Sequence, residues 1–247
     1  MENPRAVVVV PAFNEEGNVA PFLAKLVKIK KERPELVSRI IVVNDGSRDR
    51  TGKILKGFKP DVEVVTHLFN MGKARAFYSG LLRARRGKHK VMITLDADLK
   101  DVTPEHLAAL ARPLGNAPKG PKIMMSIGSA SETPRDICGE RAFLLEGLDK
   151  LVTSRGLRRA LLGNWRARRG YGLEFFLNWL FSGSHTIPRD FVSPTRRTAF
   201  SEGPTFPQGK STIDRGFGSK RYRDLLDEIR RVHGFFRERR TPRARKK

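Results

Sequence analysis

The stretch VMITLDAD, residues 91–98, joins an apolar run to two aspartates that are one residue apart. The apolar run predicts a buried strand, and Asp96 and Asp98 follow where that strand ends. Because side chains alternate along a strand, this spacing points both carboxylates to one face of the sheet. Hard divalent cations prefer carboxylate oxygens, and such a cation can bridge two phosphates. The stretch therefore predicts a metal site for a diphosphate, with capping of a turn or a helix as the alternative role of the aspartates.

Short β-branched runs alternate with amphipathic helical stretches on both sides of this strand. Strands are predicted at residues 6–10, 39–43, 62–67, 91–95 and 122–126, and helices at residues 18–32 and 72–86. A further helix is predicted after Thr103, because Thr103, Pro104 and Glu105 supply an N-cap, a first-turn proline and a first-turn acid. The alternation is typical of an α/β fold with a Rossmann-like, mostly parallel sheet flanked by helices.

The pattern changes after a proline- and glycine-rich stretch at residues 113–121. Residues 141–169 read as helical and basic, residues 173–181 as a further helix, and residues 220–237 as an amphipathic helix before a basic tail. We therefore expect three parts. These are a sheet-containing core at residues 1–130, a divergent basic helical region at 131–219, and a C-terminal helix with its basic tail at 220–247.

The composition bounds the class of protein. The chain has 247 residues, of which 39% are hydrophobic, so it can bury a sizeable core. Lysine and arginine number 49 against 26 aspartate and glutamate, and the net charge of +23 favours anionic partners. The single cysteine excludes an internal disulfide, and no segment offers the roughly 20 apolar residues of a membrane-spanning helix. We expect a cytoplasmic protein that binds peripherally to an anionic membrane surface, with a basic tail that is otherwise disordered.

Each of the first four predicted strands ends in polar residues that suit a nucleotide, at positions 11–16, 44–47, 70–73 and 96–98. Open parallel sheets bind ligands at the carboxyl ends of their strands, so these loops are expected to surround one crevice. Asp45 is placed to accept from a base or ribose, or else to form an Asx-turn or cap the helix predicted from Asp49. Glu15 and Glu16 have the alternative role of first-turn helix acids, and Lys73 that of a solvated surface lysine.

Four segments, in the order VVVVPAFNEEGN, IIVVNDGSRDRTG, NMGKARA and TLDADL, resemble the inverting family 2 nucleotide-sugar glycosyltransferases. The resemblance spans about residues 5 to 130 and is nearest to the dolichol- and polyprenol-phosphate sugar transferases. It implies a GT-A fold and a nucleotide-sugar donor, either a GDP-sugar or a UDP-sugar. It also implies a Mg²⁺ or Mn²⁺ ion that acts as a Lewis acid on the leaving diphosphate.

The resemblance further implies roles for the residues that match the family's motifs. Asp98 would be the direct metal ligand, Asp96 would act beside it at the ribose and diphosphate, and Asp45 would contact the base. Asp96 and Asp98 are thus the expected catalytic carboxylates on the donor side. The implied substrate-binding residues of this half are Pro11, Ala12, Phe13, Asn14, Glu15, Asp45, Gly46, Lys73, Asp96 and Ala97.

The acceptor side is predicted from the second half of the chain. If the acceptor is a hydroxyl, Glu174 is the candidate catalytic base, with a helix-start acid as its alternative role. If the acceptor is a lipid-linked phosphate, it needs cations, and Arg135 and Arg141 are the candidate phosphate ligands. Arginines and aromatic residues at 155–181 favour contact with an anionic membrane, or else a packed core.

Two observations keep other functions open. The polyprenol-phosphate enzymes usually carry an arginine after Gly-Ser or Gly-Thr, whereas residues 128–131 read GSAS here, so a soluble hydroxyl acceptor stays an alternative. The charge of +23 and the arginine clusters also fit a basic nucleic-acid-binding protein without catalysis. The sequence contains no helix-turn-helix, zinc-finger or RNA-recognition signature, so we expect a glycosyltransferase with no nucleic-acid partner.

Overall fold

The computed structural model describes residues 5–115, 124–130, 140–146, 148, 173–174, 177 and 205–206. The elements in chain order are β1 (Ala6–Ala12), α1 (Val19–Glu32), β2 (Val37–Asn44), α2 (Thr51–Lys56), β3 (Glu63–Thr66), α3 (Lys73–Ala84), β4 (Val91–Thr94), α4 (Pro104–Ala111), β5 (Met125–Ile127), β6 (Ser129–Ala130), β7 (Arg141–Leu144) and β8 (Thr205–Phe206).

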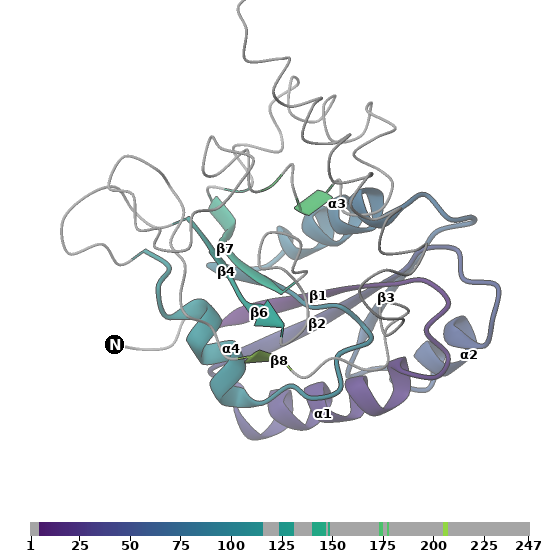
Figure 1. The fold of residues 1–247 in the computed structure, drawn as a ribbon, viewed down its shortest axis with the longest axis horizontal. Coiled ribbons are helices and arrows are strands. Elements are labelled where there is room, and N and C mark those ends of the chain that lie inside the picture. Colours follow the sequence, from purple (N-terminus) through teal and green to yellow (C-terminus); the bar gives the residue numbers. More distant parts are fainter. Residues whose placement is uncertain are drawn as a thin grey trace, which may run out of the picture.

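A six-stranded sheet with the order β3-β2-β1-β4-β7-β5 forms the centre of the fold (Figure 1). The first four strands pair in parallel, which confirms the predicted mostly parallel sheet, whereas β7 runs antiparallel between β4 and β5. The chain moves outward from β1 to β3 and then adds β4 on the other side of β1. The strand order therefore reverses between β1 and β4, and parallel sheets bind ligands at the carboxyl ends of strands at such a point.

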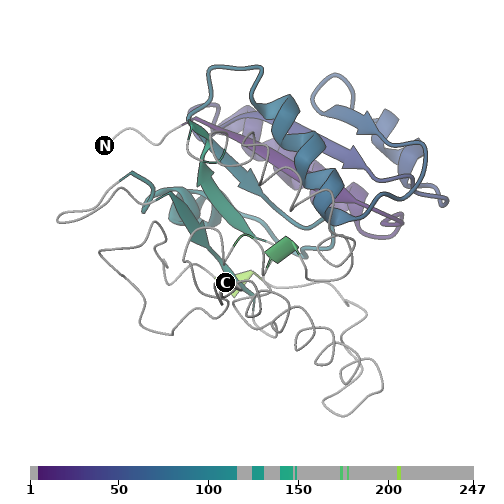
Figure 2. The same cartoon turned by 90° about the horizontal axis from the view of Figure 1, so that it is seen from above.

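Helices cover both faces of the sheet. Figure 1 and Figure 2 show α1 and α4 on one face and α3 on the other. The alternation of side chains along β1 explains this layering. Val8 and Val10 pack with apolar side chains of α1 and α4 in one buried cluster, whereas Val9 lies against Gly80 of α3. Both faces of this inner strand are therefore apolar, as its continuous valine run requires.

Helix α3 packs close to the sheet because residue 80 is glycine. A Cβ atom at Gly80 would lie 2.3 Å from Cγ1 of Val9, well inside van der Waals contact. One turn earlier, the rings of Phe77 and Phe143 meet edge to face with their centroids 5.8 Å apart. These contacts fix the position of α3 over the sheet, and with it the position of Lys73 in the first turn of the helix.

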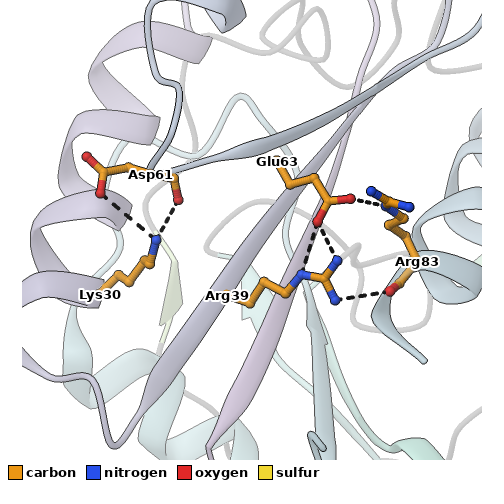
Figure 3. A network of polar contacts seen from close by, with 5 residues as sticks. All are labelled: Lys30, Arg39, Asp61, Glu63 and Arg83. Carbon is orange, nitrogen blue, oxygen red and sulfur yellow. Dashed lines mark hydrogen bonds and ion pairs between the residues drawn. The ribbon is translucent and has the colours of Figure 1, made fainter. Parts of the chain in front are cut away.

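Ion pairs join the helices to the strands away from the carboxyl ends. Figure 3 shows Glu63, at the start of β3, between the guanidinium groups of Arg39 in β2 and Arg83 in the last turn of α3. Lys30 of α1 donates to the backbone carbonyl of Asp61 at 2.7 Å. Because these side chains are partly exposed, each pair adds little to stability. They link the last turns of α1 and α3 to the start of β3 and to the loop before it.

The structure corrects one predicted element and confirms others. Residues 141–144, predicted as the start of a basic helix, form β7, because their backbone pairs with β4 on one side and β5 on the other. The cap predicted at Thr103 is confirmed, since its hydroxyl accepts from the backbone N–H of His106 at 3.3 Å and Pro104 begins α4. The other predicted strands and helices of the first half are found with shifted ends.

Most of the second half of the chain lies outside the described residues. This includes the predicted helix at 220–237, the basic tail and most of residues 145–169 and 173–181. The division into parts at residues 130 and 219 stays a prediction, although the sheet takes β7 from beyond residue 130. Within the described ranges, no helix has the length and apolarity that crossing a bilayer requires.

We predict that Gly80→Ala destabilises the protein although alanine is the better helix former. Helix propensity alone would favour alanine by about 1 kcal/mol. The clash with Val9 in a packed interior costs more, and we expect the free energy of unfolding to fall by about 1 to 2 kcal/mol in urea titrations. Gly17→Ala is the control, because nothing lies within 4 Å of its added Cβ. A Gly80→Ala protein as stable as wild type would contradict the close packing.

Candidate functional site

A pocket of about 430 Å³ opens at the carboxyl ends of β1 and β4, where the strand order reverses. Its volume is typical of sites for small molecules, and carboxylates, a lysine and strand-end loops face it together. The lining residues are Pro11, Ala12, Phe13, Glu15, Asp45, Asn70, Gly72, Lys73, Ala76, Asp96, Ala97 and Asp98. The four loops that the sequence predicts around one crevice therefore do meet there.

The loops after β1 and β2 are joined by reciprocal hydrogen bonds. Asn14 donates its backbone N–H to Oγ of Ser47 at 3.0 Å and accepts from the backbone N–H of Arg48 at 2.9 Å. Two residues later, Glu16 accepts from the backbone N–H of Arg50 at 2.9 Å. Asn14 takes a φ of 56°, a left-handed conformation that asparagine adopts more readily than most residues. The two loops therefore form one connected wall of the pocket.

Glu15 and Glu16 do not serve as first-turn acids, because α1 begins at Val19 and its first turn contains no acid. Glu15 instead lines the pocket, where its carboxylate accepts from Nδ2 of Asn18 at 2.9 Å. Its backbone N–H donates to Oγ1 of Thr51 at 2.8 Å. The side chain is thus held by its neighbours in a position that faces the ligand space.

Asp45 is buried, and its carboxylate holds the loop that leads into α3. Its Oδ1 accepts from the backbone N–H of Met71 at 2.9 Å, and its Oδ2 accepts from that of Gly72 at 2.8 Å. Oδ1 also lies 2.7 Å from Nδ1 of His67, which contacts Oγ of Ser79 in α3 at 2.9 Å through Nε2. Asp45 therefore lines the pocket and at the same time positions the first turn of α3.

Asp45 takes neither alternative role predicted for it: Asp49 forms an Asx-turn instead, and the N-cap of α2, Arg50, makes no side-chain cap bond. Oδ1 of Asn44 accepts from the backbone N–H of Ser47, three residues on, at 3.1 Å. Asp49 accepts from the backbone N–H of Thr51, the first residue of α2, at 3.0 Å. The sequence pattern was therefore typical of such bonds but did not show which residue makes them.

Gly46 allows two of these loops to pack against each other. Its φ is +68°, and an added Cβ would lie 2.2 Å from the backbone carbonyl carbon of Phe69. A residue with a side chain would face both a strained backbone and a backbone clash. Gly46 thus shapes the base of the loop that carries Asn70 into the pocket, although it does not line the pocket itself.

Lys73 connects two carboxylates that are far apart in the sequence. Its Nζ lies 2.8 Å from Oδ1 and 3.0 Å from Oδ2 of Asp96, and 2.7 Å from Oε1 of Glu174. The side chain of Glu174 is 2% exposed, and that of Lys73 is 30% exposed. The alternative reading of Lys73 as a solvated surface lysine is therefore wrong. The structure also brings Glu174, from the second half of the chain, to the donor-side residues.

The carboxylates of the pocket repel one another, and the lysine is their nearby cation. Burial, with the neighbouring Asp96 carboxylate, raises the pKa of Asp98. Burial also raises the pKa of Glu15, with smaller contributions from Asp98 and Asp96. Burial opposes the charged form of Lys73, but Asp96 and Glu174 outweigh it and raise the pKa of the ammonium well above its ordinary value. Lys73 is therefore a permanent positive charge in the pocket.

The residues of the pocket fit a divalent cation that also binds a substrate. Asp96, Asp98 and Glu15 present oxygen atoms, which Mg²⁺ and Mn²⁺ prefer. A cation would offset the burial and the repulsion that raise the pKa values of Asp98 and Glu15. Within the part of the chain that the structure describes, no group of three or more His, Cys, Asp or Glu side chains is arranged to hold a metal ion.

Most of the predicted donor-side residues line the pocket, whereas the predicted acceptor arginines do not. Arg141 is 1% exposed in β7 and is not among the lining residues, and Arg135 lies outside the described residues. Their role as phosphate ligands stays a prediction. Sequence reasoning missed His67 and Ala76. His67 ends a predicted strand. Ala76 follows Lys73 at helical spacing, which places Lys73 and Ala76 on the same side of α3.

Comparison with known proteins identifies a family. Residues 7–151 match the model of glycosyl transferase family 2. A dolichyl-phosphate β-glucosyltransferase of Trichomonas vaginalis is 31% identical over 192 residues, which cover 72% of this chain and 54% of that protein. The human dolichyl-phosphate β-glucosyltransferase is 30% identical over 146 residues, which cover 55% of this chain and 44% of that protein. The chain thus spans about half the length of the curated relatives that it matches.

Solved structures confirm the expected GT-A fold. Glucosyl-3-phosphoglycerate synthase from Mycobacterium tuberculosis, solved with Mn²⁺, UDP and phosphoglyceric acid, matches with a TM-score of 0.60 over 94% of this chain and 79% of that chain, at 17% identity. A mannosyltransferase from Pyrobaculum calidifontis, solved with GDP-Man and Mn²⁺, matches with a TM-score of 0.56 over 95% of this chain and 73% of that chain, at 15% identity.

We predict that Asp98→Asn makes the ligand-free protein more stable at neutral pH. When folding raises the pKa of a carboxyl, the folded protein loses stability as the pH rises through the folded-state pKa and the carboxyl ionises. Asparagine cannot ionise, so the variant should unfold at a higher temperature than wild type at pH 7. The difference should vanish below the ordinary pKa of 3.8, where Asp98 is protonated in both states. Thermal unfolding across pH measures this, and a less stable variant at pH 7 would contradict it.

Proposed function

The chain belongs to glycosyl transferase family 2, and we propose that it transfers a sugar from a GDP- or UDP-sugar to a lipid-linked acceptor of the polyprenol-phosphate kind, with inversion at the sugar and in dependence on a divalent cation. One observation carries the proposal. Asp96 and Asp98 face a pocket at the reversal of strand order, together with the ammonium of Lys73.

The proposal assigns different residues of the pocket to each part of a nucleotide-sugar donor. Asp45 and Phe13 lie on the loops after β2 and β1 and are the proposed contacts for the base and the nucleoside. Asp45 keeps acceptor capacity, because each carboxylate oxygen has two lone pairs and Oδ2 is used by the backbone N–H of Gly72 alone among the described contacts. Lys73, next to Asp96, is the proposed cation for the diphosphate.

Asp98 and Asp96 would hold the divalent cation, with Glu15 nearby and with diphosphate oxygens completing its ligands. When bound, such a cation neutralises the charge that develops on the leaving diphosphate, which is stabilisation concentrated in the transition state. The solved structural neighbours were obtained with Mn²⁺ and UDP or with GDP-Man and Mn²⁺, which supports the same choice of ligands here.

A phosphate acceptor suits the charge of this protein. Curated relatives are dolichyl-phosphate β-glucosyltransferases, and the net charge of +23 favours an anionic acceptor and an anionic membrane surface. A phosphate is already an anion, so transfer to it requires positioning more than a strong base. Leu68 and Phe69, exposed by 98% and 63% next to Asn70 at the rim of the pocket, add apolar surface for peripheral contact with lipid.

The donor half of the proposal is tested by calorimetric titration with UDP and GDP, each with and without Mn²⁺. We expect Mn²⁺-dependent binding of one of them. Loss of a supporting group around a metal costs about tenfold or more in affinity, and loss of a direct ligand in Asp98→Ala should cost at least that. Asp101→Ala is the matched control, because its carboxylate pairs with Lys25 at the surface. Unchanged Mn²⁺-dependent binding in Asp98→Ala would overturn the assignment.

The acceptor half is tested with the corresponding nucleotide sugars. We expect transfer to a polyprenyl phosphate presented in anionic vesicles, measured as a radiolabelled lipid product, and little transfer to soluble hydroxyl compounds. The alternative, a hydroxyl acceptor with Glu174 as catalytic base, predicts product with soluble acceptors only. That result would reject the lipid-phosphate acceptor and leave the donor assignment intact.

A further inference from the structure

Glu174 is buried next to the pocket but does not line it. Its side chain is 2% exposed, and Oε1 lies 2.7 Å from Nζ of Lys73. Oε2 is buried and accepts no hydrogen bond from any part of the chain that the structure describes. The pocket is lined by Lys73 and Asp96 but not by Glu174. Glu174 therefore contacts a residue that lines the pocket, Lys73, but does not itself face the ligand space.

Lys73 has three N–H donors and uses them on two carboxylates. Two contacts, at 2.8 and 3.0 Å, go to the two oxygens of Asp96, and the third goes to Glu174. A carboxylate buried as deeply as Glu174 is costly without a cation, so the pair holds together firmly. Without Glu174, the full charge of the lysine would rest on Asp96 alone. It would then compete there with any divalent cation.

We propose that Glu174 is a positioning residue that acts through Lys73. It shares the ammonium with Asp96, so that Asp96 balances only part of the lysine's charge and can also bind a divalent cation, while Lys73 is held in place for the diphosphate. The inference rests on the proposed function, because it concerns binding of a nucleotide diphosphate with its cation. It assigns to Glu174 a role other than catalytic base, since the carboxylate is 2% exposed and does not line the pocket.

A double-mutant cycle tests this with binding, not turnover, as the main readout. Wild type, Glu174→Gln, Lys73→Met and the double variant are titrated with UDP and GDP in the presence of Mn²⁺. We expect Glu174→Gln to weaken Mn²⁺-dependent nucleotide binding by about tenfold, as loss of a supporting group around a metal does. In the Lys73→Met background the same change should have almost no effect, because the group through which Glu174 acts is absent.

The opposite outcomes overturn the proposal. An equal loss in both backgrounds would mean that Glu174 acts by its charge and not through the lysine. Unchanged nucleotide and Mn²⁺ affinity, with a lower kcat and a lost limb of the pH–rate profile in Glu174→Gln, would mean that Glu174 is the catalytic base. If wild type binds neither nucleotide, the proposed function itself fails, and the inference falls with it.

A second variant covers the case in which Glu174→Gln does not fold. Glu174→Asp keeps the charge but shortens the side chain, so it should weaken the contact with Lys73. We expect a smaller loss of Mn²⁺-dependent binding than for Glu174→Gln, and again no loss in the Lys73→Met background. Thermal unfolding of each variant separates a folding defect from a binding defect. If Lys73→Met/Glu174→Asp binds the nucleotide with Mn²⁺ more weakly than Lys73→Met alone does, the proposal is rejected.

Discussion

The structure depends on one electrostatic constraint: several carboxylates are gathered at the point where the strand order reverses, and one ammonium lies among them. Burial and mutual repulsion raise the pKa of Asp98 and Glu15, so the ligand-free pocket holds charge that it stabilises poorly. Lys73 offsets part of that charge through Asp96 and Glu174. Charged groups that destabilise the free protein and have shifted pKa values are typical of functional sites.

The position of this ammonium is fixed by the whole of helix α3. At its beginning, Asp45 accepts the backbone N–H groups of Met71 and Gly72, and at its last turn Arg83 pairs with Glu63. In between, Gly80 lets the helix lie against Val9. Of the residues that make these contacts, Asp45 and Gly72 line the pocket, whereas Glu63, Gly80 and Arg83 do not. Together these contacts determine where the ammonium stands relative to the acids after β4.

The sequence predicted those parts of the fold and the site whose signals are local. The strand that precedes Asp96 and the cap at Thr103 are each signalled within a few residues, and both are found. The strand at 141–144 was predicted as helix because apolar residues continue after it at helical spacing, while the strands that pair with it are distant in the chain. The roles of Asp45 depend on partners 22 to 27 residues away. The contact between Lys73 and Glu174 has no local signal at all.

The place of β7 in the sheet has a consequence for how the chain can be divided. This strand lies between β4 and β5, so the sheet is completed only by residues that follow the glycosyl-donor motifs. A fragment that ended at residue 130 would leave the edge of β4 unpaired and β5 without a neighbour. Bare strand edges of this kind invite association with other chains. Residues on both sides of position 130 therefore complete one sheet, and substitutions in β7 can affect the pocket through its pairing with β4.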